Sequence, residues 1–436
     1  MKSLPRCRNH SLSAGIRYAT TEELADEILA TEHYAKDLGG ELYHYNGKVY
    51  VSGGEDHIKS KVVELLRAED LMSKWTVHKG NEVVELIRIG VPELWERPSL
   101  DKIVLRNGIL NLDTMTLDKA TPNHRTTVWL PVNYDPDATC PEWERFIGQV
   151  FPSDSQDIAW EIPGLLMTPF HIQKAILLYG PSGNGKSTYL NAIKAFLGLH
   201  NVSVVALHTL EERFGSWGII GKLANIYSDL PNQTIRSLSI FKAITGGDDI
   251  QVEHKFSQPY RYHPFCRLVF SANHPPQSRD ADQATFDRWE MISLSHRFRG
   301  EQEERPQEEL LNILATPQEL SGLLNMAIVA WRRITQGNNL TESESMSEIS
   351  AEFFEVSDPF VTWMRRRTRE NPRSVLPCAI LRDTYNAERQ PGVAPMMDTP
   401  LGLKMKERFP NVKRAQHRVG GGNPRWCYVG LELLAL

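Results

Sequence analysis

The sequence has few cysteines and no long hydrophobic run. Its five cysteines lie far apart and include no C-x-x-C pair, which argues against a disulfide framework and a cysteine zinc site. No uncharged apolar stretch approaches the roughly 18–20 residues of a membrane helix. Residues 1–20 lack the apolar run and small-residue cleavage site of an export signal. We therefore expect a soluble, cytoplasmic protein with no membrane partner.

What is present is a globular composition with unevenly distributed charge. Hydrophobic residues make up 41% and charged residues 24% of the sequence. The length of 436 residues allows about two to four domains with cores of their own. The formal net charge is −5, yet residues 359–436 hold 14 Lys and Arg against 6 Asp and Glu, which leaves −13 for residues 1–358. A basic C-terminal unit thus follows an acidic body, and nucleic acid remains a candidate partner.

The pattern of helices, strands and breaks divides the chain into four segments. Residues 1–150 combine a helical pattern after Thr20 with short alternating strands, which predicts an N-terminal α+β domain. Residues 151–340 alternate strands and helices and end in a helical lid, a pattern typical of an α/β nucleotide-binding core. Residues 341–358 are rich in Ser, Glu, Thr and Asn, which predicts a linker. Residues 359–436 form the basic C-terminal domain.

The strongest motif fits G-x-x-x-x-G-K-S/T and reads Gly180, Pro181, Ser182, Gly183, Asn184, Gly185, Lys186, Ser187, Thr188. An apolar run precedes it and a helical pattern follows, so strand, loop and helix come in the required order. Glycines let successive backbone N–H groups curl around a phosphate at the positive end of a helix dipole. We expect all nine residues to bind ATP, with Lys186 on the β- and γ-phosphates and the Ser187 hydroxyl on Mg²⁺.

Three further polar residues complete a candidate hydrolytic site with the catalytic Lys186. Asp229 ends an apolar run and can bind Mg²⁺ and position water, and Asn273 ends the next apolar strand. Ligands of an open α/β sheet lie at the carboxyl ends of its strands, so both should face the phosphates. Arg288, with Arg279 as its rival, can stabilise the charge that develops on the γ-phosphate. Taken singly, these residues also fit a loop Asp, a turn Asn and a surface ion pair.

In order and spacing these residues resemble the superfamily 3 helicases, in particular the group of the poxvirus helicase-primase and the satellite-phage and plasmid replication proteins. Loop lysine, acid, Asn and Arg all fall within residues 180–288. Residues 104–112 and 131–136 are similar to the domain that precedes the helicase core in this group, and residues 321–325 to the segment that follows it. The resemblance implies a P-loop NTPase fold of the AAA+-like, superfamily 3 type.

A second motif supports the same resemblance. Residues 241–256 are similar to the family's additional motif, a lysine followed by T-G-G-D and a second lysine. In those proteins this motif forms a hairpin that enters the central pore and grips single-stranded DNA. The resemblance therefore implies that Lys242, His254 and Lys255 bind DNA. Without the family, the pattern predicts a turn, a strand and a second turn, which also fits a solvated hairpin with no DNA role.

Two departures from the family pattern bear on the mechanism. Several relatives carry paired acids where this chain has Asp229 alone, so Asp229 acts by itself or with a second acid such as Asp248. Larger relatives also carry a primase-polymerase domain, for which this chain has neither the length nor an obvious cluster of catalytic Asp residues. We therefore expect no primase activity.

The basic C-terminal segment has the element order of a winged helix. Helical patterns near residues 360–364 and 400–409 precede a glycine-rich basic turn at 420–425 and an apolar strand at 426–431. The family often ends in such a domain. Duplex DNA is its expected partner, held mainly through phosphates. A basic surface for protein contacts is the alternative.

The resulting hypothesis is an ATP-dependent DNA helicase for a phage, plasmid or mobile element in the host cytoplasm. As in the family, it would form a homohexamer that translocates on single-stranded DNA by hydrolysing MgATP, with Arg288 acting on the neighbouring subunit. A replication primase or polymerase is a further candidate partner. The main alternative is an ATP-switched, DNA-binding initiator or loader that does not unwind. A P-loop enzyme acting on a small substrate, such as a kinase, has no use for the hairpin motif.

Overall fold

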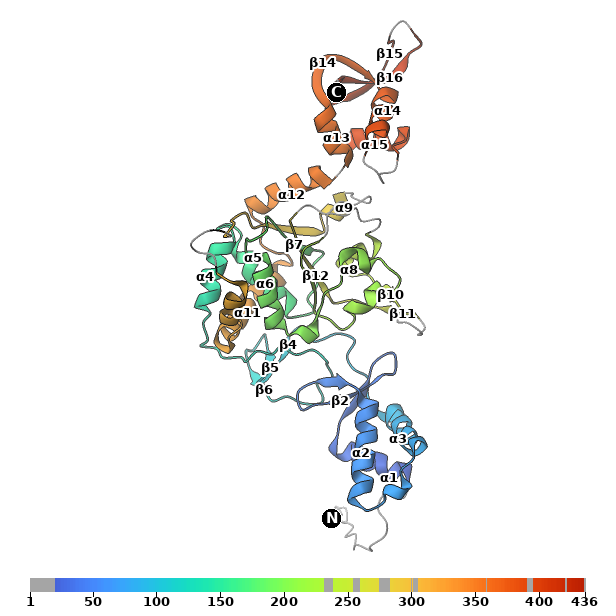
Figure 1. The fold of residues 1–436 in the computed structure, drawn as a ribbon, viewed down its shortest axis with the longest axis vertical. Coiled ribbons are helices and arrows are strands. Elements are labelled where there is room, and N and C mark those ends of the chain that lie inside the picture. The colour runs from blue at the N-terminus through green and yellow to red at the C-terminus, as the bar shows by residue number, and fades with distance from the viewer. Residues whose placement is uncertain are drawn as a thin grey trace, which may run out of the picture. The chain divides into compact units, whose positions relative to one another are not determined.

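The protein is described by a computed structural model that covers residues 20–230, 238–253, 259–273, 283–298, 300, 305–357, 359–389, 395–419 and 422–434. It forms two compact units, Met1–Tyr134 and Asp135–Leu436, whose elements are labelled in Figure 1. Within the described ranges no single helix is long and apolar enough to cross a membrane. The adjoining helices 307–314 and 317–337 meet that criterion of length and composition only together, as a pair bent by 70°.

The first unit combines packed helices with two antiparallel three-stranded sheets in its described residues. Its first helix starts at Thr20 in a capping box, in which Thr20 Oγ1 accepts from Glu23 N at 3.2 Å and the Glu23 carboxylate accepts from Thr20 N at 3.0 Å. The apolar faces of the helices bury Leu24, Val62 and Val83 in one core. The elements are α1 Thr21–Thr31, β1 Tyr34–Lys36, β2 Leu42–Tyr45, β3 Tyr50–Ser52, α2 Gly54–Ala68, η1 Met72–Lys74, α3 Val77–Gly90, β4 Lys102–Leu105, β5 Gly108–Asn111 and β6 Leu117–Asp118.

Two apolar stretches of this unit are hairpins, although each reads as one alternating strand in the sequence. Residues 42–51 fold back because the Asn46 side-chain oxygen accepts from the backbone N–H groups of Lys48 and Val49, both at 3.0 Å. Such an Asx turn competes with continuation of the strand. Residues 102–111 also turn back on themselves, and β4 and β5 pair antiparallel.

The second unit is a mixed α/β structure built on a five-stranded parallel sheet. Its strand order is β13-β7-β12-β9-β8. The apolar runs at 175–179 and 267–272 are strands, and all six residues of β12 are buried. The strands are β7 Ala175–Tyr179, β8 Val202–Ser203, β9 Ala224–Tyr227, β12 Arg267–Ala272 and β13 Trp289–Ser293. Because all run the same way, the residues that follow β7, β9 and β12 share one edge of the sheet.

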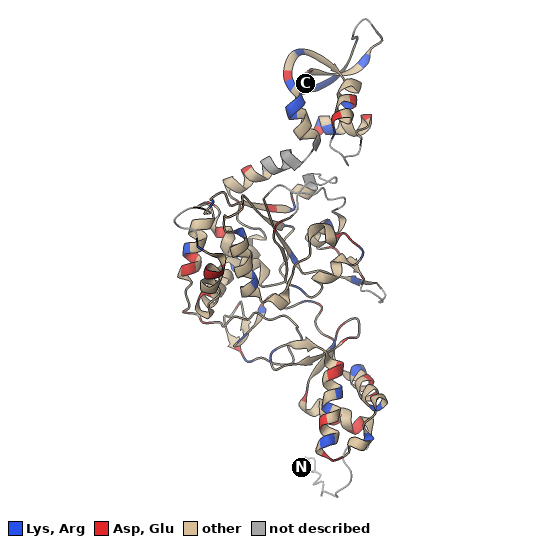
Figure 2. Cartoon of the chain, in the orientation of Figure 1, with Lys and Arg blue, Asp and Glu red and all other residues tan. Residues whose placement is uncertain are grey.

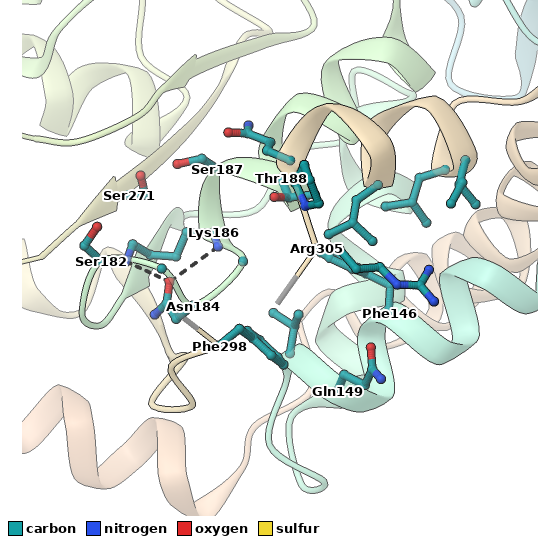
Figure 3. Close-up of a pocket in the computed structure, with 18 of the residues that line it drawn as sticks. Phe146, Gln149, Ser182, Asn184, Lys186, Ser187, Thr188, Ser271, Phe298 and Arg305 are labelled. Carbon is teal, nitrogen blue, oxygen red and sulfur yellow. Dashed lines mark hydrogen bonds between the residues drawn. The ribbon is translucent and has the colours of Figure 1, made fainter. Parts of the chain in front are cut away.

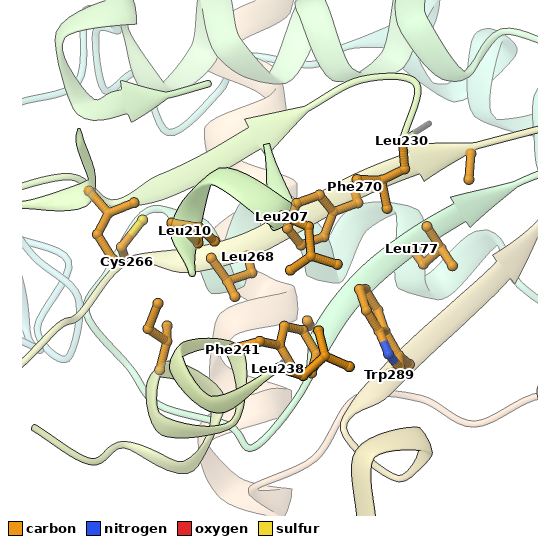
Figure 4. Close-up of a cluster of buried hydrophobic side chains, with 14 of the residues drawn as sticks. Leu177, Leu207, Leu210, Leu230, Leu238, Phe241, Cys266, Leu268, Phe270 and Trp289 are labelled. Atoms are coloured by element: carbon orange, nitrogen blue, oxygen red, sulfur yellow. The ribbon is translucent and has the colours of Figure 1, made fainter. Parts of the chain in front are cut away.

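Helices cover this sheet and bury its apolar side chains. On one side, Phe241 of α8 stacks on Trp289 of β13 with ring centroids 4.6 Å apart, next to Leu177, Leu268 and Phe270 from the strands (Figure 4). The remaining elements of the core are α4 Pro141–Val150, α5 Gln156–Leu166, α6 Lys186–Leu197, η2 Leu199–Asn201, α7 Leu207–Leu210, η3 Gly215–Ile219, α8 Ser239–Gly246, β10 Ile250–Val252, β11 Tyr260–Tyr262, α9 Gln283–Phe286, α10 Gln307–Leu314, α11 Pro317–Gly337 and α12 Glu344–Ser357. Helix α12 occupies most of the segment predicted as a linker.

The C-terminal part pairs three helices with a three-stranded antiparallel sheet of order β14-β16-β15 in its described residues. Phe360, Leu381, Met405 and Tyr428 form its core. The helix expected at 400–409 and the strand expected at 426–431 are present, whereas β14 gives no strand signal because it is polar and contains Pro372. The elements are α13 Pro359–Arg367, β14 Thr368–Pro377, α14 Cys378–Glu388, α15 Asp398–Arg408, β15 Lys413–His417 and β16 Arg425–Leu433.

Candidate functional site

The glycine loop joins β7 to α6 at the carboxyl edge of the parallel sheet. Gly180, Gly183 and Gly185 have φ of 145°, 83° and 88°, which L side chains rarely adopt. A Cβ at Gly180 would lie 2.2 Å from the Leu294 oxygen, and one at Gly185 would lie 2.8 Å from Val150 Cγ2. Gly185 is the N-cap residue of α6. The first N–H groups of that helix, which have no partner within the helix, open onto the loop, where an anion is favoured.

Lys186 lies inside the loop. Its Nζ donates to Gly180 O at 2.6 Å and to Pro181 O at 2.8 Å. It also donates to Asn184 Oδ1 at 3.0 Å (Figure 3). Only 6% of the residue is exposed. This burial lowers the pKa of the amine to about 8, although the negative charge of Asp229 partly offsets the effect.

Asn184 ties the loop to the end of β13. Its amide nitrogen donates to Leu294 O, while its oxygen accepts from Lys186. Phe298 N also donates to Gly183 O, at 3.0 Å. The motif leaves position 184 unspecified, but here that side chain orders both the loop and the lysine. Of the other motif residues, Ser182 and Ser187 are exposed and Thr188 is buried in the first turn of α6.

Asp229 and Asn273 follow neighbouring strands, β9 and β12, and meet at the same edge. Asn273 Nδ2 donates to Asp229 Oδ1 at 3.0 Å. Asp229 N donates to Ser271 Oγ at 3.1 Å, and Asp229 holds a positive φ of 64°. This is a strained conformation for a non-glycine residue, and the contacts with β12 maintain it. The carboxylate is thereby fixed in direction beside the glycine loop.

These residues line one cavity of about 790 Å³, a size typical of small-ligand sites. Figure 3 shows the loop on one side and α4 with the segment before α10 on the other. The lining is Glu142, Arg145, Phe146, Gln149, Val150, Ser182, Gly183, Asn184, Gly185, Lys186, Ser187, Thr188, Asp229, Ser271, Asn273, Phe298, Arg305, Pro306, Gln307, Leu310, Ile313 and Leu314. The site therefore combines anion-binding N–H groups, a lysine, a fixed carboxylate and an apolar wall.

Sequence reasoning missed the far wall of this cavity. Arg145, Phe146 and Gln149 come from α4, and Phe298 and Arg305 come from the segment after β13. In the sequence the two phenylalanines look like core aromatics and the arginines like surface charges. No local signal marks them, since they reach the loop only through tertiary packing.

Two residues of the cavity are of the kind that could hold a magnesium ion together with phosphates. Mg²⁺ in such sites takes one or two protein ligands and keeps waters and phosphate oxygens as the others. Ser187 and Asp229 both line the cavity. In the described part of the chain, no group of three or more His, Cys, Asp or Glu side chains is placed to hold a metal ion. Asp248, the candidate second acid, does not line the cavity.

Arg288 lies at the opposite edge of the sheet. Its backbone oxygen accepts from Ala175 N at 2.7 Å, at the start of β7, whereas the glycine loop follows the end of β7. A five-residue strand spans about 16 Å. The side chain instead turns to α8, where Nη1 donates to Lys242 O at 3.0 Å and to Thr245 Oγ1 at 3.2 Å. The structure thus does not bring Arg288 to its own chain's loop.

The motif proposed for DNA binding surrounds a short hairpin. Strands β10 and β11 pair antiparallel, and Asp249 at their base accepts from Arg261 and lies 2.8 Å from His263 Nδ1. Lys242 lies on α8, directly before this hairpin. His254 and Lys255 lie outside the described residues, as does Arg279.

Comparison with known proteins gives two family matches and a structural likeness. Residues 27–152 match a family described as D5 N terminal like, and residues 178–288 match a family of unknown function (DUF5906). The A form apo structure of the NrS-1 C-terminal region has 13% identity and a TM-score of 0.50, and the apo structure of its residues 305–718 has 12% and 0.52. Each alignment covers 93% of this chain and 98% of the other. At these identities the likeness shows a shared fold.

The two family matches fall on the regions that carry the sequence resemblance. The first includes residues 104–112 and 131–136, and the second runs from β7 through Arg288. The matches fit the group of phage and viral replication proteins that the sequence resembles.

Proposed function

We propose that this chain is an ATP-dependent DNA helicase that assembles into a ring, as a homohexamer, and serves replication of a phage, plasmid or other mobile element. One observation carries the proposal: the loop that encloses Lys186 and the hydrogen-bonded side chains of Asp229 and Asn273 line a single cavity. A strand, glycine loop and helix in this arrangement support a P-loop NTPase of the AAA+-like type.

Different residues of the cavity would have different roles in phosphoryl transfer. The loop and the N-terminal N–H groups of α6 would hold the phosphates, and Lys186 would exchange its loop carbonyl partners for the β- and γ-phosphate oxygens. Mg²⁺ held by Ser187 and Asp229 would supply charge neutralisation. Asn273 orients the Asp229 carboxylate and lies where it can position the attacking water.

The position of Arg288 supports action on a neighbouring subunit. It lies about 16 Å from the loop of its own chain, so in a ring it would act on the nucleotide of an adjacent copy. Its bonds to Lys242 O and Thr245 on α8 also connect it to the element that leads into the β10–β11 hairpin. This supports transmission of hydrolysis to a hairpin that grips single-stranded DNA, with Lys242, His254 and Lys255 as its DNA contacts.

The C-terminal part supports a DNA-binding role. Its order of elements, α13, β14, α14, α15, β15 and β16, with sheet order β14-β16-β15, agrees with a winged helix. Its 14 Lys and Arg against 6 Asp and Glu favour a polyanion. The same features suit the second candidate, an ATP-switched replication initiator or loader that binds DNA without unwinding it.

ATP hydrolysis with and without single-stranded DNA tests the proposal. The wild type should hydrolyse MgATP and be strongly stimulated by single-stranded DNA, Lys186→Ala should be inactive, and Lys255→Ala should keep basal turnover but lose the stimulation. Lys119→Ala, at an exposed position of the first unit, is the matched control. Slow turnover that responds neither to DNA nor to Lys255→Ala would favour the initiator.

A further inference from the structure

The hairpin of β15 and β16 carries a tryptophan that does not belong to the core. Trp426 is 50% exposed, whereas the next two residues of β16, Cys427 and Tyr428, are buried. The Arg414 guanidinium lies over the indole at 4.9 Å from the ring centroid. An exposed indole backed by a planar cation is a preformed stacking surface.

The register of the hairpin places this pair beside α15. Arg414 is paired with Tyr428, and Gln416 with Trp426, so these four side chains share one face of the sheet. Tyr428 packs into the C-terminal core, while Trp426 lies two residues nearer the hairpin tip. Arg414 Nη1 lies 3.5 Å from the position that a Cβ at Gly402 of α15 would occupy. The indole therefore extends the surface of α15 outward along the hairpin.

The charge around the indole is of one sign. Residues 409–431 contain no Asp or Glu but four basic residues, Lys413, Arg414, Arg418 and Arg425. Figure 2 marks the Lys and Arg of the C-terminal part in blue and its Asp and Glu in red. The carboxylates nearest in sequence on β16 and α15 pair with other arginines, since Glu432 accepts from Arg369 at 2.8 Å and the Glu407 carboxylate lies 3.7 Å from Arg408 Nε.

We propose that Trp426 and Arg414 form a stacking site for an unpaired base of single-stranded DNA. Duplex recognition through phosphates needs cations but no bare aromatic face, because the base faces of a duplex are covered by their neighbours. A single strand offers a phosphate backbone to the basic side chains of the hairpin and an uncovered base face to the indole. The C-terminal part then holds the unpaired strand, rather than the duplex that its winged-helix order alone suggests.

This inference rests on the proposed function only in taking DNA as the partner, and it needs no ATP hydrolysis. Binding of the full chain to fluorescein-labelled oligothymidine, and to a blunt duplex of equal length, is measured by anisotropy without nucleotide. Trp426→Ala should weaken binding to the single strand by about 5- to 150-fold, the value of one base stack, with little effect on the duplex. Trp426→Phe should restore most of the affinity. Arg373→Ala, which removes an exposed cation of β14, should weaken both forms alike.

Photocrosslinking locates the contact directly. A single strand that contains 5-iododeoxyuridine should crosslink to the peptide carrying Trp426, in the wild type and in the hydrolysis-deficient Lys186→Ala. The same base inside a duplex should not crosslink there. Equal losses on single strand and duplex, or no crosslink at Trp426, would overturn the stacking site. A chain that lacks ATPase activity but crosslinks at Trp426 would refute the proposed function and leave this inference standing.

Discussion

The placement of Arg288 at the amino edge of the sheet leads to a complementation test between two inactive variants. Arg288→Ala removes the side chain that would act on a neighbour's nucleotide, and Asp229→Asn disables the site itself. Asn tolerates the positive φ of position 229 and retains the backbone bond to Ser271. Each variant alone should lose about 10³-fold or more of the ATPase rate.

Mixed rings should regain activity in a predictable amount. The ATP site at a subunit interface is active when one subunit supplies an intact Asp229 and its neighbour supplies an intact Arg288. Random assembly of equal amounts makes such interfaces at about a quarter of positions, since subunit contacts in a cyclic ring are heterologous. The rate should therefore recover to about a quarter of the wild-type value and fall away on either side of equal mixing.

The assay is ATP turnover by complexes purified through a different tag on each co-expressed variant. A mixture of Asp229→Asn with Lys186→Ala is the matched control, because both lesions affect the same site and no interface is repaired. If the Arg288→Ala and Asp229→Asn mixture stays as inactive as its components, Arg288 does not act between subunits, and the argument from sheet polarity is refuted.

Three further predictions concern the cavity and helix α4, which forms part of its wall. Gly185→Ala should destabilise the protein by about 1–3 kcal/mol in urea denaturation, because φ is 88° and the new Cβ would lie 2.8 Å from Val150. The control Gly90→Ala, where the added Cβ meets nothing within 4 Å, should be tolerated. Equal effects of the two substitutions would argue against the loop geometry. Burial lowers the pKa of Lys186 to about 8, and bound phosphates should raise it again. MgADP binding at pH 8 should therefore take up about half a proton, measured by calorimetry in buffers of different ionisation enthalpy. No uptake, or the same uptake in Lys186→Arg, would exclude Lys186 as the group that gains the proton. The Glu319 carboxylate caps the N-terminus of α4, where it accepts from Glu142 N at 3.3 Å and Trp143 N at 3.2 Å. Glu319→Ala should therefore lower the free energy of unfolding by about 2–4 kcal/mol, and Glu319→Gln by less. An unchanged urea midpoint in Glu319→Ala would show that this cap contributes nothing.

The phosphate-binding edge could be predicted from sequence because its signals are local. The apolar run at 175–179, the glycines at 180, 183 and 185, and the helical pattern after Lys186 each specify backbone conformation over a few residues. Asp229 and Asn273 meet because parallel strands align their carboxyl ends.

Other parts of the site depend on packing that the sequence does not reveal. Asn184, Phe298 and Arg305 acquire their roles because segments more than a hundred residues apart in the chain fold against one another. In the sequence alone, nothing distinguishes these residues from others of their type. Likewise, 42–51 reads as a strand by alternation, yet the side chain of Asn46 turns it. Helix α12 arises in a polar segment that composition alone assigns to a linker.

Strand displacement from a forked DNA tests the central claim most directly. The full-length wild type with MgATP should release the labelled strand, whereas Lys186→Ala, and the wild type with ADP in place of ATP, should not. Turnover of ATP by a wild type that binds the fork but never separates its strands would contradict the helicase assignment.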